Sequence, residues 1–196
     1  MDQLQGRMAE PAGNAVSSDG RAPDGPGDAM LDAKLWHNPC PFTFRINYIA
    51  LRYNGPLYDW VKRRYGLSRP EYVCLYSLAL ADGGQASDIT RTSGFPKNTL
   101  SRAVSRLEAL GLVARERSGS GRGRGQALHL TGGGWALFRK TLPVFEARER
   151  ALLSGLNRQE HSTLLHLLAK VVDSAEAAPS SIGADEEPLS EEDGRP

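Results

Sequence analysis

Several features that mark common protein classes are missing from this chain. Its 196 residues contain no apolar run near the roughly 20 residues that a membrane-spanning helix needs. The segment MDQLQGRMAEPAG has no apolar stretch of the kind found in a secretory signal. Only two cysteines are present, Cys40 and Cys74, too few for a disulfide framework. These absences favour a cytoplasmic protein in a reducing compartment, with no membrane partner.

Patterns typical of enzymes and metal proteins are missing as well. The four histidines are scattered, and His161 and His166 are five residues apart, which does not place both on one face of a helix. The chain has no Ser/His/Asp arrangement, no paired carboxylates in an apolar context and no Walker motif. We therefore expect no enzyme activity, no metal and no cofactor.

The net charge of +1 conceals an uneven distribution of charge. Residues 1–33 carry six acids and two arginines, and the chain from Asp173 onward carries eight acids and one arginine. Between Gln85 and Lys140, ten Lys/Arg face three acids. Such a basic centre is the electrostatic footprint of a module that binds duplex nucleic acid. The ends are poor in large apolar residues, so we expect residues 1–33 and 175–196 to be disordered.

Apolar periodicity predicts six helices in the remainder of the chain. The first covers residues 42–65 and contains Pro56, which donates no hydrogen bond, so we expect a kink or two helices there. The others are expected at residues 68–80, 86–92 and 96–110, after Thr131 with a bend at Pro143, and after Asn157. Ser68 with Glu71, and Asn157 with Glu160, have the capping-box spacing.

Residues 87–131 are the centre of this organisation. They predict a short helix, a turn at residues 93–95, a second helix, and two strands joined by a Gly/Arg loop at residues 118–125. This is the outline of a winged helix-turn-helix. The predicted fold class is therefore mainly α, with six helices and a wing of two to three strands.

The polar face of the 96–110 helix is the candidate surface for reading DNA. Asn98 and Arg102 lie one turn apart, where an amide suits adenine and a guanidinium suits guanine in the major groove. Phosphate contacts suit Lys97, Thr99 and Arg106, while Ser101 and Ser105 are short donors for phosphate or base edges. The alternative is an ordinary solvated helix face.

The loop at residues 118–125 is the predicted wing tip, and Arg122 or Arg124 would enter a narrow minor groove. A phosphate-cradling glycine loop is a weak alternative, because a strand follows and not a helix. An RNA-binding Arg/Gly segment and a hairpin tip with no partner are the other readings.

Residues 35–174 resemble the MarR family of bacterial transcription regulators. The resemblance rests on TSGFPKNTLSRAVSRLEALGLV, on LHLT at the end of the wing with the helix after it, and on GLNRQE before the last helix. It implies one MarR-like domain at residues 34–174, with dimerisation helices at 34–66 and 133–174 and a winged helix at 67–132. It also implies a homodimer that binds double-stranded DNA at a palindromic operator, and a repressor released by a small aromatic or phenolic acid. In this wing Arg124 matches the family's arginine, but Arg122 stands where the family usually has an acid, so the wing should contribute mainly charge.

The effector of this family lies between the dimerisation helices and the winged helix. Cationic and aromatic side chains there would suit an aromatic carboxylate; the candidates are His37, Arg45, Tyr48, Arg52, Tyr72 and Tyr76. The alternative is that the tyrosines are core or dimer contacts and the arginines are salt-bridge partners.

Two other functions remain open. Cys40 precedes the first helix, and a helix N-terminus favours a thiolate, so the chain is alternatively a repressor that senses peroxide through this thiol. A winged helix can also serve as a module that binds protein and not DNA.

Overall fold

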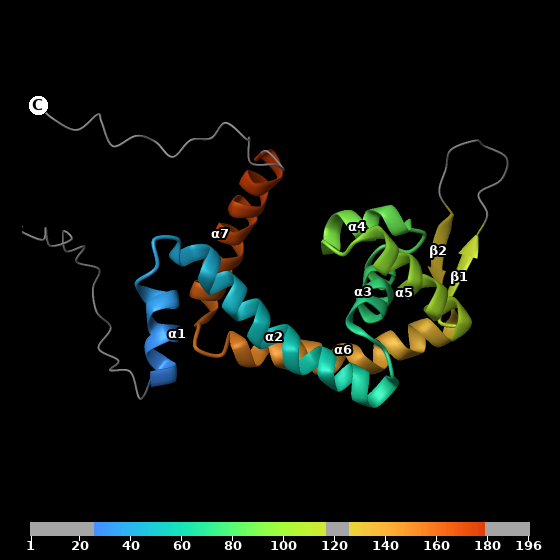
Figure 1. Ribbon diagram of the computed structural model, residues 1–196, viewed down its shortest axis with the longest axis horizontal. Coiled ribbons are helices and arrows are strands. Elements are labelled where there is room, and N and C mark those ends of the chain that lie inside the picture. Colours follow the sequence, from blue (N-terminus) through green and yellow to red (C-terminus); the bar gives the residue numbers. More distant parts are fainter. Residues whose placement is uncertain (1–25, 117–125, 179–196) are drawn as a thin grey trace, which may run out of the picture. The chain divides into compact units, whose positions relative to one another are not determined.

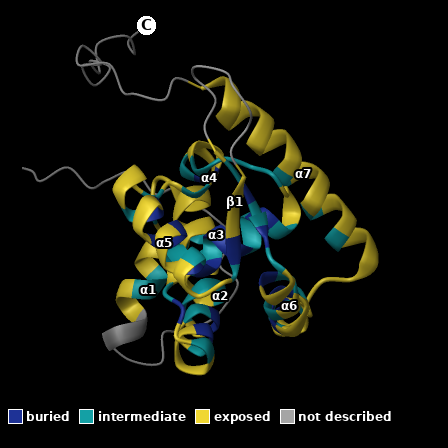
Figure 2. Cartoon of the chain, turned by 90° about the vertical axis from the view of Figure 1, so that its right-hand side faces the viewer, coloured by how far each residue is buried: buried dark blue, intermediate teal, exposed yellow. Residues whose placement is uncertain are grey.

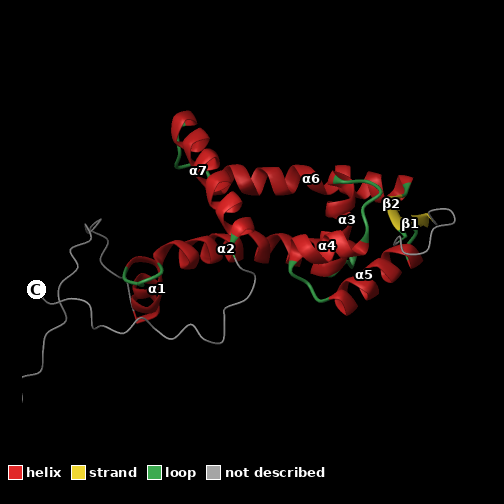
Figure 3. Ribbon diagram, turned by 90° about the horizontal axis from the view of Figure 1, so that it is seen from above, coloured by secondary structure: helices red, strands yellow, loops and turns green. Residues whose placement is uncertain are grey.

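The computed structural model describes residues 26–116 and 126–178, which contain seven helices and two strands (Figure 3). The predicted fold class, a mainly helical winged helix-turn-helix, is confirmed. The chain divides into two compact units, Met1–Arg52 and Tyr53–Pro196, which are described separately. The predictions for residues 1–25 and 179–196 lie outside the described residues.

The first unit contains α1 (Pro26–Trp36) and the first part of α2 (Pro41–Tyr65). Here the structure differs from the sequence-based expectation of disorder as far as residue 33, because residues 26–33 are helical. The prediction of disorder used the composition of residues 1–33 as a whole, which does not reveal a short helical segment within it. The end of α1 is held by Arg45 of α2, whose Nε donates to the Leu35 carbonyl at 2.9 Å and whose guanidinium lies 4.3 Å from the Trp36 ring centre.

Helix α2 runs without interruption through Pro56, so of the two predicted outcomes, a kink or two separate helices, the second does not occur. It ends at Tyr65, and Gly66 follows with a φ of +68°, a conformation that favours glycine. Leu57 and Val61, on the part of α2 in the second unit, are buried in the core.

Helices α3 (Arg69–Leu80), α4 (Ala86–Ser93) and α5 (Lys97–Ala109) pack together in the second unit (Figure 1). Their buried side chains form most of the core, shown in dark blue in Figure 2: Tyr72, Cys74, Leu75, Leu78, Ile89, Leu100, Ala103, Val104 and Leu107. The predicted cap of α3 is confirmed, because the Ser68 N–H donates to the Glu71 carboxylate at 2.7 Å. Helix α4 starts at Ala86, as predicted, and the Gln85 N–H donates to Asp88 at 3.0 Å.

The wing stem consists of β1 (Val113–Glu116) and β2 (Ala127–Leu130), an antiparallel pair in which Val113 faces Leu130 and Ala114 faces His129. Leu128 and Leu130 are buried, and β2 packs against α3 and α6. The stem therefore shares the core of the helix-turn-helix.

Helices α6 (Gly132–Leu152) and α7 (Arg158–Ala177) complete the chain. As predicted, Thr131 caps α6 by accepting from the Gly134 N–H at 3.1 Å, and Asn157 caps α7 by accepting from the Glu160 N–H at 3.0 Å. Helix α6 continues through Pro143. In the part of the chain that the structure describes, no helix is both long and apolar enough to cross a membrane.

Candidate nucleic-acid interface

Helix α5 presents two different faces. Leu100, Ala103, Val104 and Leu107 are buried at helical spacing against the core. The opposite stripe has the same i, i+3, i+4, i+7 spacing and is exposed: Asn98, Ser101, Arg102 and Ser105. Lys97 and Arg106 are exposed on either side of this stripe, and Thr99 is half-buried. A polar stripe flanked by two cations suits base edges at its centre and phosphates at its sides.

Asn98 is already engaged within α5. Its Oδ1 accepts a hydrogen bond from the Thr99 N–H at 2.8 Å, beside the N-terminus of the helix. Bidentate pairing with adenine uses the same oxygen to accept from N6, so one of its two lone pairs is already engaged. Arg102 is exposed on the same stripe.

The C-terminal part of α5 is connected to the wing stem through Arg115. Its Nε donates to Glu108 of α5 at 2.8 Å, and its Nη1 donates to the Gln126 side chain at 3.2 Å. Sequence reasoning counted Arg115 only as part of the basic charge. Nothing in the local pattern relates residues 108, 115 and 126, which meet because the strands pair.

The turn before α5 has a cation above an aromatic ring. The Arg69 guanidinium lies 5.7 Å from the ring centre of Phe95 and 5.2 Å from that of Tyr58. The turn itself is possible because Gly94 adopts a φ of +70°. Arg69 therefore connects α2 with the residue that precedes the N-terminus of α5.

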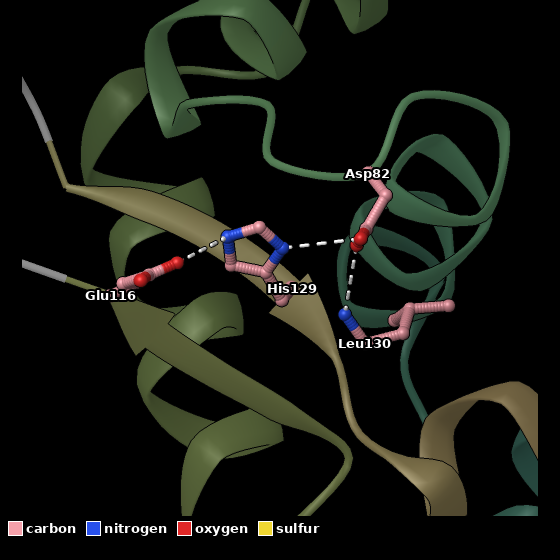
Figure 4. A network of polar contacts seen from close by, with 4 residues as sticks. All are labelled: Asp82, Glu116, His129 and Leu130. Atoms are coloured by element: carbon pink, nitrogen blue, oxygen red, sulfur yellow. Dashed lines mark hydrogen bonds and ion pairs between the residues drawn. The ribbon is translucent and has the colours of Figure 1, made fainter. Parts of the chain in front are cut away.

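A second contact missed by sequence reasoning lies at the base of the wing. His129 on β2 contacts Asp82, in the turn after α3, through Nδ1 at 3.1 Å, and Glu116 on β1 through Nε2 at 3.3 Å (Figure 4). Asp82 also accepts from the Leu130 N–H at 3.4 Å. These hydrogen bonds, above all that with His129, lower the pKa of the Asp82 carboxyl, which therefore stays ionised. The predicted wing-tip residues Arg122 and Arg124 lie outside the described residues.

The predicted effector residues fall in different surroundings. In the first unit, His37 contacts Asp32 at 3.1 Å, and Arg45 is used to hold the end of α1. Tyr48 is half-buried and Arg52 is exposed on α2. Arg45 thus has a structural role, because it contacts the Leu35 carbonyl and the Trp36 ring. Such a role is of the kind named above as the alternative to effector binding.

Tyr72 and Tyr76 belong to an aromatic cluster in the second unit. Tyr72 is fully buried, its ring stacks on Phe145 at 5.0 Å, and its hydroxyl is 2.6 Å from the Thr141 hydroxyl. Tyr76 is half-buried, with its ring centre 5.4 Å from that of Phe138. Burial raises the pKa of both phenols, that of Tyr72 to about 12, so both hydroxyls remain neutral. Tyr72 exposes no surface to a ligand and is a core residue in this structure, whereas Tyr76 retains an exposed part.

The two cysteines differ in exposure. Cys40 is exposed directly before α2, and its N–H donates to the Asn38 side chain at 2.7 Å. Cys74 is fully buried on α3, and burial raises the pKa of its thiol to about 12.

Comparison with known proteins finds the same family in sequence and in structure. A family model described as MarR family matches residues 65–122. The HTH-type transcriptional repressor Rv2887 of Mycobacterium tuberculosis is 29% identical over 106 residues, which are 54% of this chain and 76% of the repressor.

Solved structures extend the likeness over most of the chain. A MarR-family regulator from Silicibacter pomeroyi aligns with a TM-score of 0.63 and 28% identity, over 72% of this chain and 92% of that one. Rv2887 in complex with salicylic acid aligns with a TM-score of 0.54 and 26% identity, over 69% of this chain and 98% of that one. A Listeria monocytogenes regulator in complex with a 26mer DNA has the same fold, with a TM-score of 0.62 and 20% identity, over 68% of this chain and 87% of that one.

Proposed function

Since this chain belongs to the MarR family of winged-helix transcriptional regulators, we propose that it is a dimeric repressor that binds a palindromic operator and is released by a small aromatic acid. The observation that carries the DNA-binding part is the exposed stripe of α5, with Lys97 and Arg106 at its sides and the buried face held in the core. The residues proposed to contact DNA are those predicted from the sequence on α5, with Arg122 and Arg124 of the wing.

Dimerisation is proposed on the exposed apolar side chains of the terminal helices. Helix α7 has no residue buried within its own chain, and Leu165, Leu167 and Val172 are more than half exposed. Such a surface is costly in water and is typical of an interface.

An aromatic acid is proposed as effector on two grounds. The related repressor Rv2887 binds salicylic acid, and the half-buried ring of Tyr76, at the aromatic cluster, offers a face for an aromatic ligand to stack on. A peroxide-sensing repressor is the second candidate, because Cys40 is exposed. It predicts that Cys40→Ser abolishes release from DNA by peroxide and leaves release by an aromatic acid unchanged.

The test of the DNA-binding part is an affinity measurement on DNA from upstream of the gene that encodes this chain. Arg102→Ala should weaken binding by about 1–3 kcal/mol and relax the preference for the specific site, because a base contact is lost. Lys97→Ala and Arg124→Ala should weaken binding to all sequences and reduce its salt dependence. Arg158→Ala, at the exposed start of α7, is the matched control and should bind as the wild type does. Unchanged affinity of Arg102→Ala, or no salt-sensitive DNA binding by the wild type, would contradict the proposal and favour a protein-binding module.

The effector is tested by thermal unfolding with salicylate. A ligand of the folded state raises the melting temperature, and saturating salicylate should also weaken operator binding. Cyclohexanecarboxylate carries the same charge without an aromatic ring and is the control. Equal shifts with both compounds would contradict an aromatic site.

A further inference from the structure

The wing stem is attached to the turn after α3 by two backbone hydrogen bonds at Leu128, the residue before His129. The Gly83 N–H donates to the Leu128 carbonyl at 3.0 Å, and the Leu128 N–H donates to the Gly84 carbonyl at 3.0 Å. The turn after α3 therefore lies along β2, with Asp82 beside His129 and Leu130. Gly83 adopts a φ of +80°, and a Cβ there would lie 3.3 Å from the His129 ring. The imidazole thus sits at the junction between the wing and the core.

The two carboxylates lie on opposite sides of the imidazole ring (Figure 4). Asp82 faces Nδ1 and Glu116 faces Nε2, so a single metal ion cannot bind both carboxylates together with one ring nitrogen. Among the described residues, the charged side chains within ion-pair distance of the ring are Asp82 and Glu116. The neighbouring Arg115 contacts Glu108 and Gln126 instead. Both charged side chains that the described residues place at the ring are therefore acidic.

The number of protons on the ring decides how many of these contacts are favourable. A neutral imidazole has one N–H and one lone pair, whereas an imidazolium donates from both nitrogens. Asp82 is ionised, as its lowered pKa requires, and Glu116 is three-quarters exposed to water. With a neutral ring that donates to Asp82, the lone pair of Nε2 faces the Glu116 carboxylate. Only the protonated ring carries a positive charge that attracts both acids; Nε2 makes no hydrogen bond in this geometry, so its contact with Glu116 is an ion pair by distance.

We propose that His129 is a proton-dependent positioning residue of the wing, which fixes β1 and the turn after α3 to β2 when protonated and strengthens DNA binding. This inference rests on the proposed DNA binding but is independent of the effector. Histidine is the side chain whose charge ordinarily changes between about pH 5 and 8. Glu116 is the last residue of β1, so its attachment holds the end of the wing stem.

Electrostatics act in the same direction as the geometry. An unpaired Glu116 at the base of the wing repels the phosphates that Arg122 and Arg124 are proposed to approach, and an imidazolium beside it neutralises that charge. Deprotonation of His129 therefore weakens DNA binding by loosening the stem and by restoring the negative charge. Because each pair is partly exposed, the combined effect should be about two- to fivefold in affinity.

The experiment is a series of operator affinities between about pH 5.5 and 8 at constant ionic strength. The wild type should bind about two- to fivefold more tightly at the acidic end. His129→Gln retains a hydrogen-bonding side chain that does not titrate, and should remove this dependence. Glu116→Gln removes one acid and should reduce it. His166→Gln, an exposed histidine on α7, is the matched control and should keep the wild-type profile. Identical pH profiles for the wild type and His129→Gln would overturn the proposal.

A second measurement separates failure of this inference from failure of the proposed function. The backbone amides of Glu116 and Leu130 are followed by NMR through the same pH range without DNA. Their signals should shift with a single titration in the wild type and in His166→Gln, and stay in place in His129→Gln. If the wild type bound no DNA at any pH, the proposed function would fail, whereas amides that do not respond to pH would overturn the role of His129.

Discussion

At the scale of single residues, burial separates side chains that the sequence presents as equivalent. Cys40 is exposed in the first unit, while Cys74 is enclosed by the core of the second. The thiolate is the reactive form of cysteine, and burial disfavours any charged form. Of the two cysteines, only Cys40 is therefore accessible for thiol chemistry.

We expect a thiol reagent to count one reactive cysteine in the folded protein. Cys74 keeps its proton at neutral and mildly alkaline pH because burial raises its pKa to about 12. A titration with dithionitrobenzoate should detect Cys40 in the native chain and both cysteines in denaturant. Cys40→Ser should show no rapid reaction when folded. A rapid reaction of that variant would mean that Cys74 is accessible.

The buried hydrogen bond between the Tyr72 and Thr141 hydroxyls contributes to stability at the scale of a single pair. The Thr141 hydroxyl also contacts the Leu137 carbonyl at 2.9 Å, so it has both a donor and an acceptor. Thr141→Val leaves the Tyr72 hydroxyl buried without a partner and should lower the free energy of unfolding by about 1–3 kcal/mol. Tyr72→Phe leaves Thr141 bonded to the carbonyl and should cost only about 0.5–1.5 kcal/mol.

Urea unfolding of the two variants and of the double variant measures this difference. The double variant should be more stable than the sum of the two single effects predicts, because the unpaired hydroxyl is gone. Strictly additive effects would show that the bond contributes nothing.

At the scale of elements, the end of α5, the wing stem and the start of α6 are joined by hydrogen bonds and a close backbone approach. The Thr131 N–H donates to the Leu112 carbonyl at 3.1 Å, and the Thr131 hydroxyl donates to the Gly111 carbonyl at 2.6 Å. Gly134, in the first turn of α6, is buried against the same Leu112 carbonyl. The end of α5 is thereby linked to the start of α6 through the strands between them.

Gly134→Ala should be strongly destabilising. A Cβ at this position would overlap the Leu112 carbonyl oxygen and approach Leu130 within 3.2 Å, so the backbone has to move, at a cost of about 1–3 kcal/mol or more. Gly132→Ala, two residues earlier in the same helix, meets nothing within 4 Å and is the matched control. It should be neutral or slightly stabilising, by up to about 1 kcal/mol. Melting temperatures of the two variants test this, and equal values would contradict the close approach.

At the scale of the whole molecule, the terminal helices carry large apolar side chains that a single chain leaves exposed. Besides α7, the N-terminal half of α2 exposes Phe42, Ile49 and Leu51. A second copy of the chain is the proposed cover for these helices, and it would place two α5 stripes on one DNA duplex.

Leu167→Asp should convert the proposed dimer into a monomer, because Leu167 is 53% exposed and a carboxylate would be desolvated in an interface. Sedimentation at micromolar concentration measures the change. Ser162→Asp adds the same charge at an exposed polar position of α7 and should remain dimeric. A wild type that is monomeric at every concentration would contradict dimerisation itself.

The local elements and the exposed stripe of α5 were predicted from the sequence alone. The caps at Ser68, Thr131 and Asn157 and the exposed polar face of α5 were predicted, because each depends on residues a few positions apart. The same reasoning failed for residues 26–33, where composition was averaged over a longer segment that includes a short helix.

Only the tertiary structure decided which side chains meet across the chain. Asp82 and His129 are 47 residues apart and Tyr72 and Thr141 are 69 apart, so no periodic pattern relates them. Their contacts exist because β2 lies against the turn after α3 and because α6 packs on α3. The sequence by itself determined a basic winged helix-turn-helix with a helix suited to the major groove. The packing decided that Tyr72 is a core residue, that Cys74 is closed to reagents, and that the wing is tied to the core through a histidine.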